Sequence, residues 1–358
     1  MSVFVIAEAG VNHNGDIEMA HRLIDAAADA GADAVKFQTF RAADLAGRDA
    51  PKAAYQERAT GAAESQLDML RRLELAPAAH FALRDHAAKR EVAFLSTPFD
   101  SASLDFLTGE MGMETIKIPS GEITNGPFLL RIARAAQRIV LSTGMSSLGE
   151  VEAALAVLAF GLSATPDTAP SHAAFEAAFL SQAGQAALRA RVTLLHCTTE
   201  YPAAAADVNL RAMDTMAAAF GLAVGYSDHT QGIHIPVAAA ARGAVLIEKH
   251  FTLDRSLPGP DHKASLEPEE LAAMVRAIRE VEAALGDGVK RPVAAEIGNR
   301  AVVRKSLVAA RPIAAGETLS AETLACKRPG TGISPMDFWA LCGRPAARAY
   351  AEGEAIDP

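Results

Sequence analysis

The fold is decided by residues 222–261, LAVGYSDHTQGIHIPVAAAARGAVLIEKHFTLDRSLPGPD. Two short apolar runs in it, Leu222–Tyr226 and Ala244–Glu248, have the character of buried parallel strands joined by a helix of small residues. A histidine follows each run, His229 after the first and His250 after the second. Neighbouring parallel strands lie about 4.8 Å apart, so the two imidazoles can converge on one ion, with water or substrate oxygens as the other ligands. A single histidine there would more often cap a turn, but the pair predicts an open two-histidine metal site.

Length and composition limit the classes of protein. The 358 residues carry a formal charge of −9, which argues against nucleic-acid or anionic-membrane partners. The cysteines are odd in number and lack metal-ligand spacing, which is typical of a reducing cytoplasm; they are Cys197, Cys326 and Cys342. Met1 leads directly into an apolar run, and no basic leader or membrane-length apolar segment is seen. We expect a soluble cytoplasmic protein.

The sequence repeats one pattern, a short apolar run followed by a polar loop and an Ala/Leu-rich helix. The runs are Val3–Ala7, Ala34–Phe37, Val92–Leu95, Thr115–Ile118, Ile139–Leu141, Val192–Leu195, Leu222–Tyr226 and Ala244–Glu248. The expected helices are Ile17–Ala30, Glu64–Lys89, Ser101–Thr108, Pro127–Gln137, Leu148–Phe160, Leu210–Phe220, Ile233–Arg242 and Pro268–Leu285. Eight such units predict an α/β fold, a (β/α)8 TIM barrel over residues 1–285. A doubly wound open sheet is the alternative.

Polar residues follow every predicted strand, at the carboxyl end where barrel active sites lie. They are Glu8; Lys36 and Gln38; Thr97; Lys117, Ser120 and Glu122; Ser142 and Thr143; Thr199 and Tyr201; Asp228 and His229; and Lys249 and His250. Buried lysines with short hydroxyl donors, here including Ser227, suit a small phosphate or carboxylate ligand, unless the lysines simply pair with Glu8 or Glu122. Either glutamate can serve as general acid or base, and a metal ion beside them would polarise a carbonyl. These parts suggest addition of an anionic nucleophile to an aldehyde.

Two segments interrupt the repeat, and the chain changes character after the last helix. Arg41–Ala63 is a long loop on the predicted catalytic face and a candidate lid. Gly161–Arg191, with an Ala-rich helix near 173–190, precedes the sixth strand and is expected on the opposite face, in packing or assembly. Residues 286–297 are expected to be a linker and 298–358 a small domain of short strands, Ser306–Val308 and Gly316–Leu319 among them.

Ten motifs taken in order resemble those of the sialic acid synthase family, the phosphoenolpyruvate-dependent nonulosonate synthases. They are AEAGVNHNGD, AVKFQTF, FLSTPFD, IKIPSGEITN, VLSTGM, LLHCTTEYP, VGYSDHTQGIH, IEKHFTLD, PGPDHKASLEP and KRPGTGISPM. The resemblance implies a TIM barrel followed by an antifreeze-like (SAF) domain. It also implies a homodimer that exchanges this domain, so that each copy completes the partner's active site.

The resemblance implies a role for each site residue. His229 and His250 would hold Mn²⁺ or Mg²⁺, which activates the aldehyde of an open-chain N-acetylated amino sugar, and Glu8 or Glu122 would handle protons. Phosphoenolpyruvate would attack this aldehyde and lose phosphate by C–O cleavage, held by Lys36, Thr97, Lys117, Ser120, Ser142, Thr199 and Ser227. The sugar would meet Gln38, Tyr201, Asp261 and Arg328 of the partner subunit. Relatives specific for plain sialic acid can carry Asn at the position of Thr199, and the segment 161–191 exceeds the usual length.

The wording of the motifs is most similar to synthases of N,N′-diacetyllegionaminic acid, whose sugar is a 2,4-diacetamido-2,4,6-trideoxymannose. An N-acetylneuraminate synthase using N-acetylmannosamine is the nearest alternative. Two other classes stay open at this point. One is a Schiff-base aldolase using Lys36, Lys117 or Lys249, and the other is a non-catalytic carbohydrate-binding protein.

Overall fold

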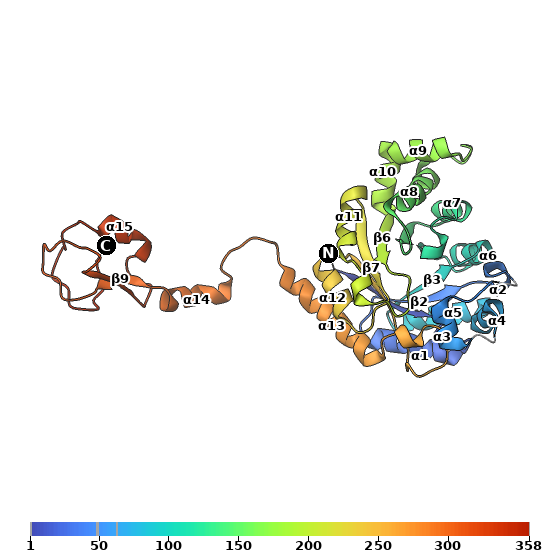
Figure 1. Cartoon of the computed structure of the whole chain (residues 1–358), viewed down its shortest axis with the longest axis horizontal. Coiled ribbons are helices and arrows are strands. Elements are labelled where there is room, and N and C mark those ends of the chain that lie inside the picture. Colours follow the sequence, from blue (N-terminus) through green and yellow to red (C-terminus); the bar gives the residue numbers. More distant parts are fainter. Residues whose placement is uncertain (1, 48–49, 62–63, 358) are drawn as a thin grey trace. The chain divides into compact units, whose positions relative to one another are not determined.

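The computed structural model describes residues 2–47, 50–61 and 64–357 (Figure 1). The chain forms two compact units, Met1–Gly286 and Asp287–Pro358. In the described residues, no helix combines the length and the apolar character needed to cross a bilayer.

The first unit is built on eight parallel strands. These are β1 (Phe4–Gly10), β2 (Ala34–Thr39), β3 (Ala93–Pro98), β4 (Thr115–Ile118), β5 (Arg138–Ser142), β6 (Val192–Cys197), β7 (Ala223–Asp228) and β8 (Leu246–His250). They are hydrogen-bonded in the order β3-β2-β1-β8-β7-β6-β5-β4, and the terminal strands β3 and β4 also lie against each other. The sheet therefore curls into a nearly closed barrel. This confirms the predicted TIM barrel and rules out the open doubly wound sheet.

Helices surround these strands (Figure 1). They are α1 (Ile17–Asp29), α2 (Ala42–Leu45), α3 (Ala54–Thr60), α4 (Gln66–Leu73), α5 (Pro77–Lys89), α6 (Ser101–Asp105), α7 (Gly126–Ala135), α8 (Leu148–Ser163), α9 (His172–Leu180), α10 (Gln182–Arg191), α11 (Arg211–Phe220), α12 (His234–Ala241) and α13 (Pro268–Leu285). Local sequence sets several of their starts. Asp16 accepts hydrogen bonds from the first turn of α1, and Ser147 with Glu150 forms a capping box at α8. The main core lies between strands and helices, and includes Val5, Leu23 and Ile132.

One predicted helix is wrong as a single element. Residues 64–89 form two helices, α4 and α5, separated by residues 74–76. Pro77 is the first residue of α5, and proline disfavours the helical conformation of the residue before it. The break separates α5 from α4, which packs against α2. The expected lid segment 41–63 contains two short helices, α2 and α3. Four residues of the segment 41–63 lie outside the described residues; they are Arg48, Asp49, Ala62 and Ala63.

The predicted Ala-rich helix near 173–190 is likewise two helices, α9 and α10, that meet at Ser181. The Ser181 hydroxyl accepts a hydrogen bond from the Gly184 N–H at 2.9 Å, so it caps the start of α10. Both helices pack on α8, and α10 leads directly into β6. The segment is thus part of the helical layer before β6.

The second unit has its own small core. It contains α14 (Ala294–Val303), β9 (Ser306–Ala309), β10 (Leu324–Lys327) and α15 (Phe338–Leu341), with β9 and β10 antiparallel. Its buried apolar residues are Leu307, Ala309, Ile313, Leu319, Leu324, Ala346, Tyr350 and Ile356. The strand predicted at Gly316–Leu319 is wrong, because this segment makes only an isolated bridge between Thr318 and Pro345.

Candidate active site

Side chains inside the barrel form layers. An apolar layer consists of Ile6, Ala34, Val140, Leu195 and Leu246, with Leu95 packed against it. Because side chains alternate across a strand, the residue two positions further along each strand also faces inward. Those residues form a polar layer of Glu8, Lys36, Thr97, Ser142, Cys197 and Glu248. One more step of two brings Gln38 and His250 to the carboxyl-terminal mouth. Within two residues, each of these strands therefore passes from an apolar side chain that packs in the barrel to a polar side chain.

Lys36 connects the two glutamates of the polar layer. Its Nζ lies 2.5 Å from Glu8 Oε2 and 3.4 Å from Glu248 Oε2, with all three side chains at most 3% exposed. It also donates to the Thr97 hydroxyl at 2.9 Å. Burying such charges is unfavourable unless they are paired, so these contacts make the cluster possible.

Glu248 connects the second lysine. Its Oε1 accepts hydrogen bonds from Lys117 Nζ at 3.1 Å and from the Ser227 hydroxyl at 2.7 Å. Burial favours the neutral carboxyl, but Lys117 and Lys36 outweigh it and lower the pKa of Glu248 below its ordinary range. At Glu8 burial prevails over the attraction of Lys36 and raises the pKa to about 7. Two carboxylates in one layer therefore differ, one ionised and one poised to exchange a proton near neutrality.

His229 and His250 lie side by side at the mouth, with ring centroids 5.6 Å apart. Tyr201 packs on both rings, with centroids 4.0 Å from His229 and 5.6 Å from His250. His229 Nδ1 is 2.6 Å from the Thr198 carbonyl oxygen, which can only accept, so the proton is on Nδ1 and the Nε2 lone pair is free. His250 Nδ1 is buried and has no hydrogen-bond partner in the described part of the chain.

These two imidazoles fit a divalent ion. Burial lowers the pKa of His229 to about 4, and burial together with His229 lowers the pKa of His250 well below its ordinary value. Both rings are therefore neutral at pH 7, the form that ligates metals. Across residues 2–47, 50–61 and 64–357, no three His, Cys, Asp or Glu side chains gather as a closed metal centre. The donor set is that of an open site, completed by water or substrate.

A second group of donors surrounds Gly144. Its backbone N–H donates to the Ser120 hydroxyl at 3.1 Å, and the Cys197 thiol lies 3.2 Å from Ser120 Oγ and 3.4 Å from Ser142 Oγ. A Cβ at residue 144 would be 2.2 Å from Thr199 Oγ1, which is itself buried without a hydrogen-bond partner among the described residues. The hydroxyls thus converge, and Thr199 has an unused acceptor and donor for a ligand.

A cavity of about 450 Å³ joins these groups, a size that suits small-molecule ligands. Its floor and walls are Glu8, Lys36, Thr97, Lys117, Ser120, Ser142, Thr199, Tyr201, His229, Glu248 and His250, with Gln38, Pro260 and Asp261 at the side. Burial raises the pKa of Asp261 to about 6. A larger cavity of about 850 Å³ opens at the amino-terminal end of the barrel, lined mainly by apolar residues such as Phe4, Leu95 and Leu246. Because the buried groups with shifted pKa values face the smaller cavity, we place the site there; they are Glu8, His229, Glu248, His250 and Asp261.

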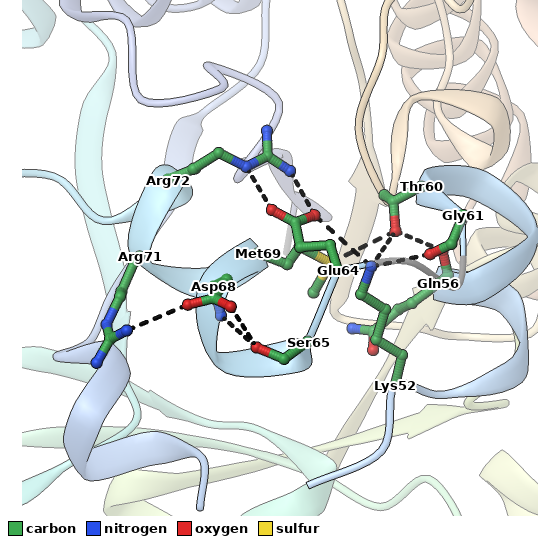
Figure 2. A network of polar contacts seen from close by, with 10 residues as sticks. All are labelled: Lys52, Gln56, Thr60, Gly61, Glu64, Ser65, Asp68, Met69, Arg71 and Arg72. Atoms are coloured by element: carbon green, nitrogen blue, oxygen red, sulfur yellow. Dashed lines mark hydrogen bonds and ion pairs between the residues drawn. The ribbon is translucent and has the colours of Figure 1, made fainter. Parts of the chain in front are cut away.

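Helices α2, α3 and α4 close one side of the cavity. We refer to residues 42–47, 50–61 and 64–73 as the cap; it contributes Leu45, Ala46, Ala53, Gln56, Gln66, Met69, Leu70 and Leu73 to the lining. Figure 2 shows the polar network that holds the cap together. The buried Lys52 donates to Thr60 Oγ1 and the Gly61 carbonyl at 3.0 Å each, and lies 3.6 Å from Glu64, which also accepts both arms of Arg72. The network connects α3 to α4.

With this geometry, comparison with known proteins decides the family. The model of the NeuB family matches residues 23–290, and the SAF domain model matches residues 304–358. The chain belongs to the NeuB family. This confirms the resemblance found in the motifs and the predicted SAF domain.

Relatives of this NeuB family member match along almost the whole chain. An N,N′-diacetyllegionaminic acid synthase of Campylobacter jejuni is 50% identical and covers 98% of both chains. A protein of the same name from Legionella pneumophila is 45% identical over 99% of this chain and 94% of its own. Among solved structures, an N-acetylneuraminic acid synthetase from Leptospira borgpetersenii in complex with citrate is 34% identical, with a TM-score of 0.66 over 84% of this chain and 90% of that one.

The NeuB barrel brings most of the predicted site residues together, and three stand apart. Glu122 is not part of the cavity lining in the described residues; its carboxylate accepts a hydrogen bond from Asn125 at 2.7 Å. Ser227 is buried beneath the cavity and orients Glu248. Arg328 belongs to the second unit, where its Nε donates to the Val303 carbonyl at 2.9 Å.

Sequence reasoning did not assign a role to two NeuB site residues, Glu248 and Cys197. The apolar run ending at Glu248 makes this residue look like part of a buried strand. Its position two residues before His250, on the same face of the strand, is the signal that indicates a role in the cavity. Lys249 lies on the opposite face, where its ammonium pairs with Asp228 at 2.6 Å and both side chains are fully buried. The Schiff-base alternative therefore loses one of its three lysines.

Proposed function

We propose that this protein condenses phosphoenolpyruvate with the aldehyde of an open-chain N-acetylated mannosamine-type sugar, giving a nonulosonic acid and phosphate. The observation that carries the proposal is the pair of neutral imidazoles directly above a layer of lysines and hydroxyls, in a NeuB family barrel. Each part of the cavity then has one task.

Phosphoenolpyruvate binds in the polar layer. Lys36 and Lys117 supply positive charge to its phosphate and carboxylate, and hydroxyl groups donate hydrogen bonds from Thr97, Ser120, Ser142 and Thr199. Ser227 acts indirectly, because it holds Glu248, which keeps both lysines in place. The low solvent exposure of Lys36, Lys117 and Glu248 strengthens each of these contacts.

His229 and His250 would hold a divalent ion, Mn²⁺ or Mg²⁺, whose contribution is to polarise the aldehyde oxygen of the sugar. Tyr201 packs on both rings and fixes their orientation. Asp261 and Gln38 lie at the side of the cavity and bind sugar hydroxyl or amide groups.

The reaction forms one carbon–carbon bond, and at C2 a bond to the oxygen of water replaces the bond to the oxygen of phosphate. The methylene carbon of phosphoenolpyruvate attacks the aldehyde carbon, and the aldehyde oxygen takes a proton. Water adds at C2, the bond between C2 and the phosphate oxygen breaks, and a ketone remains. The two protons of water balance the proton taken by the aldehyde oxygen and the proton that leaves with phosphate. We assign the transfer of the proton at the aldehyde oxygen to Glu8, because its pKa is near 7. Its Oε1 lies beside His250 and Gln38, and would be 3.4 Å from a Cβ at Gly10. We assign Glu122 no direct step, because it makes its contact outside the cavity lining.

The active site is completed by a second copy of the chain. In this proposal Arg328 of the partner subunit binds the sugar, in a homodimer that exchanges its SAF domain. The enzyme works in the cytoplasm, where phosphoenolpyruvate is available and the free cysteines Cys197, Cys326 and Cys342 stay reduced.

The favoured sugar is 2,4-diacetamido-2,4,6-trideoxymannose, and the product is N,N′-diacetyllegionaminic acid. Two relatives that bear that product's name, at 50% and 45% identity over nearly the full chain, support it. N-acetylmannosamine is the second candidate, supported by the solved relative named for N-acetylneuraminic acid.

Turnover tests the proposal directly. The protein is incubated with phosphoenolpyruvate, Mn²⁺ and each sugar in turn, and the product is identified by mass spectrometry. We expect phosphate release together with a product that has gained three carbons from phosphoenolpyruvate. Pyruvate trapped on the protein by borohydride would instead support a Schiff base; the pKa of Lys117 argues against it, because Glu248 and Glu8 raise that pKa despite burial.

A further inference from the structure

The inner wall of the cap is apolar. Residues of the cap and its neighbours form a separate apolar cluster, distinct from the barrel core. Those of its members that face the cavity are Val11, Leu45, Met69, Leu70, Leu73 and Phe99. By contrast, the barrel side of the same cavity is charged and hydroxyl-rich. The cavity therefore has a polar floor and an apolar wall.

Two amides interrupt this wall. Gln56 Oε1 accepts the Ala53 N–H at 3.0 Å, which fixes the amide and leaves its NH₂ group as a donor. Gln66 lines the cavity at the start of α4, and its amide has no hydrogen-bond partner among the described residues. The wall thus offers amide groups within an apolar surface, a pattern that matches an N-acetyl group, in which an amide carries a methyl.

The position of the reacting aldehyde fixes which end of the sugar meets the cap. The aldehyde must lie at His229 and His250, above the lysines that hold the attacking enol. The remaining carbons of an open-chain sugar must extend away from this point, and the polar floor is already filled by phosphoenolpyruvate. The space left for C4 to C6 is bounded by the cap.

We propose that the cap determines which sugar is used: its apolar wall accepts the 4-acetamido methyl and the 6-methyl group, and its amides bind the 4-acetamido group. This inference rests on the proposed function and adds the residues that select the substrate. Leu70 and Gln66 are the residues that select the sugar. Both line the cavity, and both are only half-buried by protein, so part of each side chain is open to contact with a ligand. A sugar with hydroxyl groups at C4 and C6 leaves those groups without partners against Met69, Leu70 and Leu73.

The test is the ratio of kcat/KM for 2,4-diacetamido-2,4,6-trideoxymannose to that for N-acetylmannosamine, with phosphoenolpyruvate and Mn²⁺ saturating. We expect the unmodified protein to favour the diacetamido sugar by about ten- to a hundred-fold, the range for discrimination by an apolar pocket. Leu70→Gln should lower this ratio about ten-fold, because the new amide offers a hydrogen-bond partner to the C4 and C6 hydroxyl groups of N-acetylmannosamine. Gln66→Met should reduce kcat/KM for the diacetamido sugar more than for N-acetylmannosamine.

Leu67→Gln is the matched control, since Leu67 lies on the same helix and is buried, but outside the cavity lining. It should leave the ratio unchanged, even if it lowers thermal stability. The ratio of the two kcat/KM values could stay unchanged in both Leu70→Gln and Gln66→Met, or change equally in Leu67→Gln. Either result would overturn the role of the cap and leave the proposed function untouched. No turnover with either sugar would overturn the proposed function, and this assignment with it.

Discussion

Glu248 neutralises two lysines at once, the buried Lys36 and the largely buried Lys117. Its replacement by Gln keeps the shape and leaves Lys36 and Lys117 with less negative charge nearby. We expect Glu248→Gln to lower the free energy of unfolding by about 3 kcal/mol, because removing one partner of a buried pair leaves an uncompensated charge. Phosphoenolpyruvate should restore much of this loss, since it brings negative charge to the same lysines.

Urea denaturation with and without phosphoenolpyruvate measures both effects. Glu114→Gln is the control, because the Glu114 carboxylate forms an exposed ion pair with Arg138, and loss of that pair should change stability by about 0.5 kcal/mol or less. Equal effects of the two substitutions would show that Glu248 has no special role.

Asp261 predicts a pH-dependent stability difference. Burial raises its pKa from 3.8 to about 6, so the folded state holds this proton where the unfolded state has lost it. The carboxyl therefore favours folding fully below pH 4 and loses this contribution as the pH rises to about 6. At pH 8, Asp261→Asn should be the more stable protein by about 1–3 kcal/mol, and near pH 4 the two should agree. Urea denaturation in EDTA at both pH values checks this; a difference independent of pH would contradict it.

At the scale of single residues, the sequence predicted most of the cavity, because strand ends are recognisable by the change from apolar to polar residues. It could not tell which of two neighbouring polar residues faces inward. Lys249 and His250 looked equivalent, and only the strand register assigns one to an outer ion pair and the other to the cavity. Glu122 looked like Glu8, yet its position in a 3₁₀ turn directs its carboxylate to Asn125.

The loop after β5 depends on Gly144. A Cβ there would lie 2.2 Å from Thr199 Oγ1, 2.7 Å from Ser120 Oγ and 2.8 Å from Cys197 Sγ. Gly144→Ala should therefore displace the hydroxyl groups proposed to bind phosphate and raise the KM for phosphoenolpyruvate about ten-fold or more, since such positioning is exacting. Gly149→Ala is the control, because it lies in α8 with nothing within 4 Å, and there Ala should be neutral or stabilising. Steady-state kinetics decide; equal KM values in the two variants would contradict the role of Gly144.

Among the elements, the barrel strands were predictable because eight continuous apolar runs leave little choice of fold. The cap was not. Its helices α2 and α3 have only four and seven residues, so their sequence is typical of a loop. The contacts of Lys52 with Gly61 and Glu64 help to hold them in place. Pro77 signals a break between α4 and α5. The helical pattern of the residues on both sides nevertheless favours one continuous helix.

At the scale of the whole molecule, the proposed exchange of SAF domains predicts complementation between two inactive variants. His229→Ala disables the barrel of its own chain, and Arg328→Ala removes the arginine that its chain supplies to the partner. A mixed dimer would pair an intact barrel with an intact arginine. Co-refolding the two variants should restore about a quarter of normal activity, because half of the dimers are mixed and one of their two sites is intact. If Arg328 served its own barrel, mixing would restore nothing.

The two units themselves could be inferred from the sequence, because the repeat of strand and helix ends near residue 285 and a second apolar core follows. The proposed pairing of copies could not be inferred from residue patterns alone, because a domain exchange depends on the length and path of a linker and not on local preferences. Only the resemblance of the motifs to the family pointed to it.

The central claim is that His229 and His250 act through a bound divalent ion in the condensation of phosphoenolpyruvate with an amino sugar. Its most direct test is the rate of phosphate release from phosphoenolpyruvate and the diacetamido sugar after removal of metal with EDTA and after addition of Mn²⁺. The account predicts that release stops on chelation, returns with Mn²⁺ in the unmodified protein and does not return in His229→Ala. Undiminished phosphate release from the metal-stripped protein would contradict it.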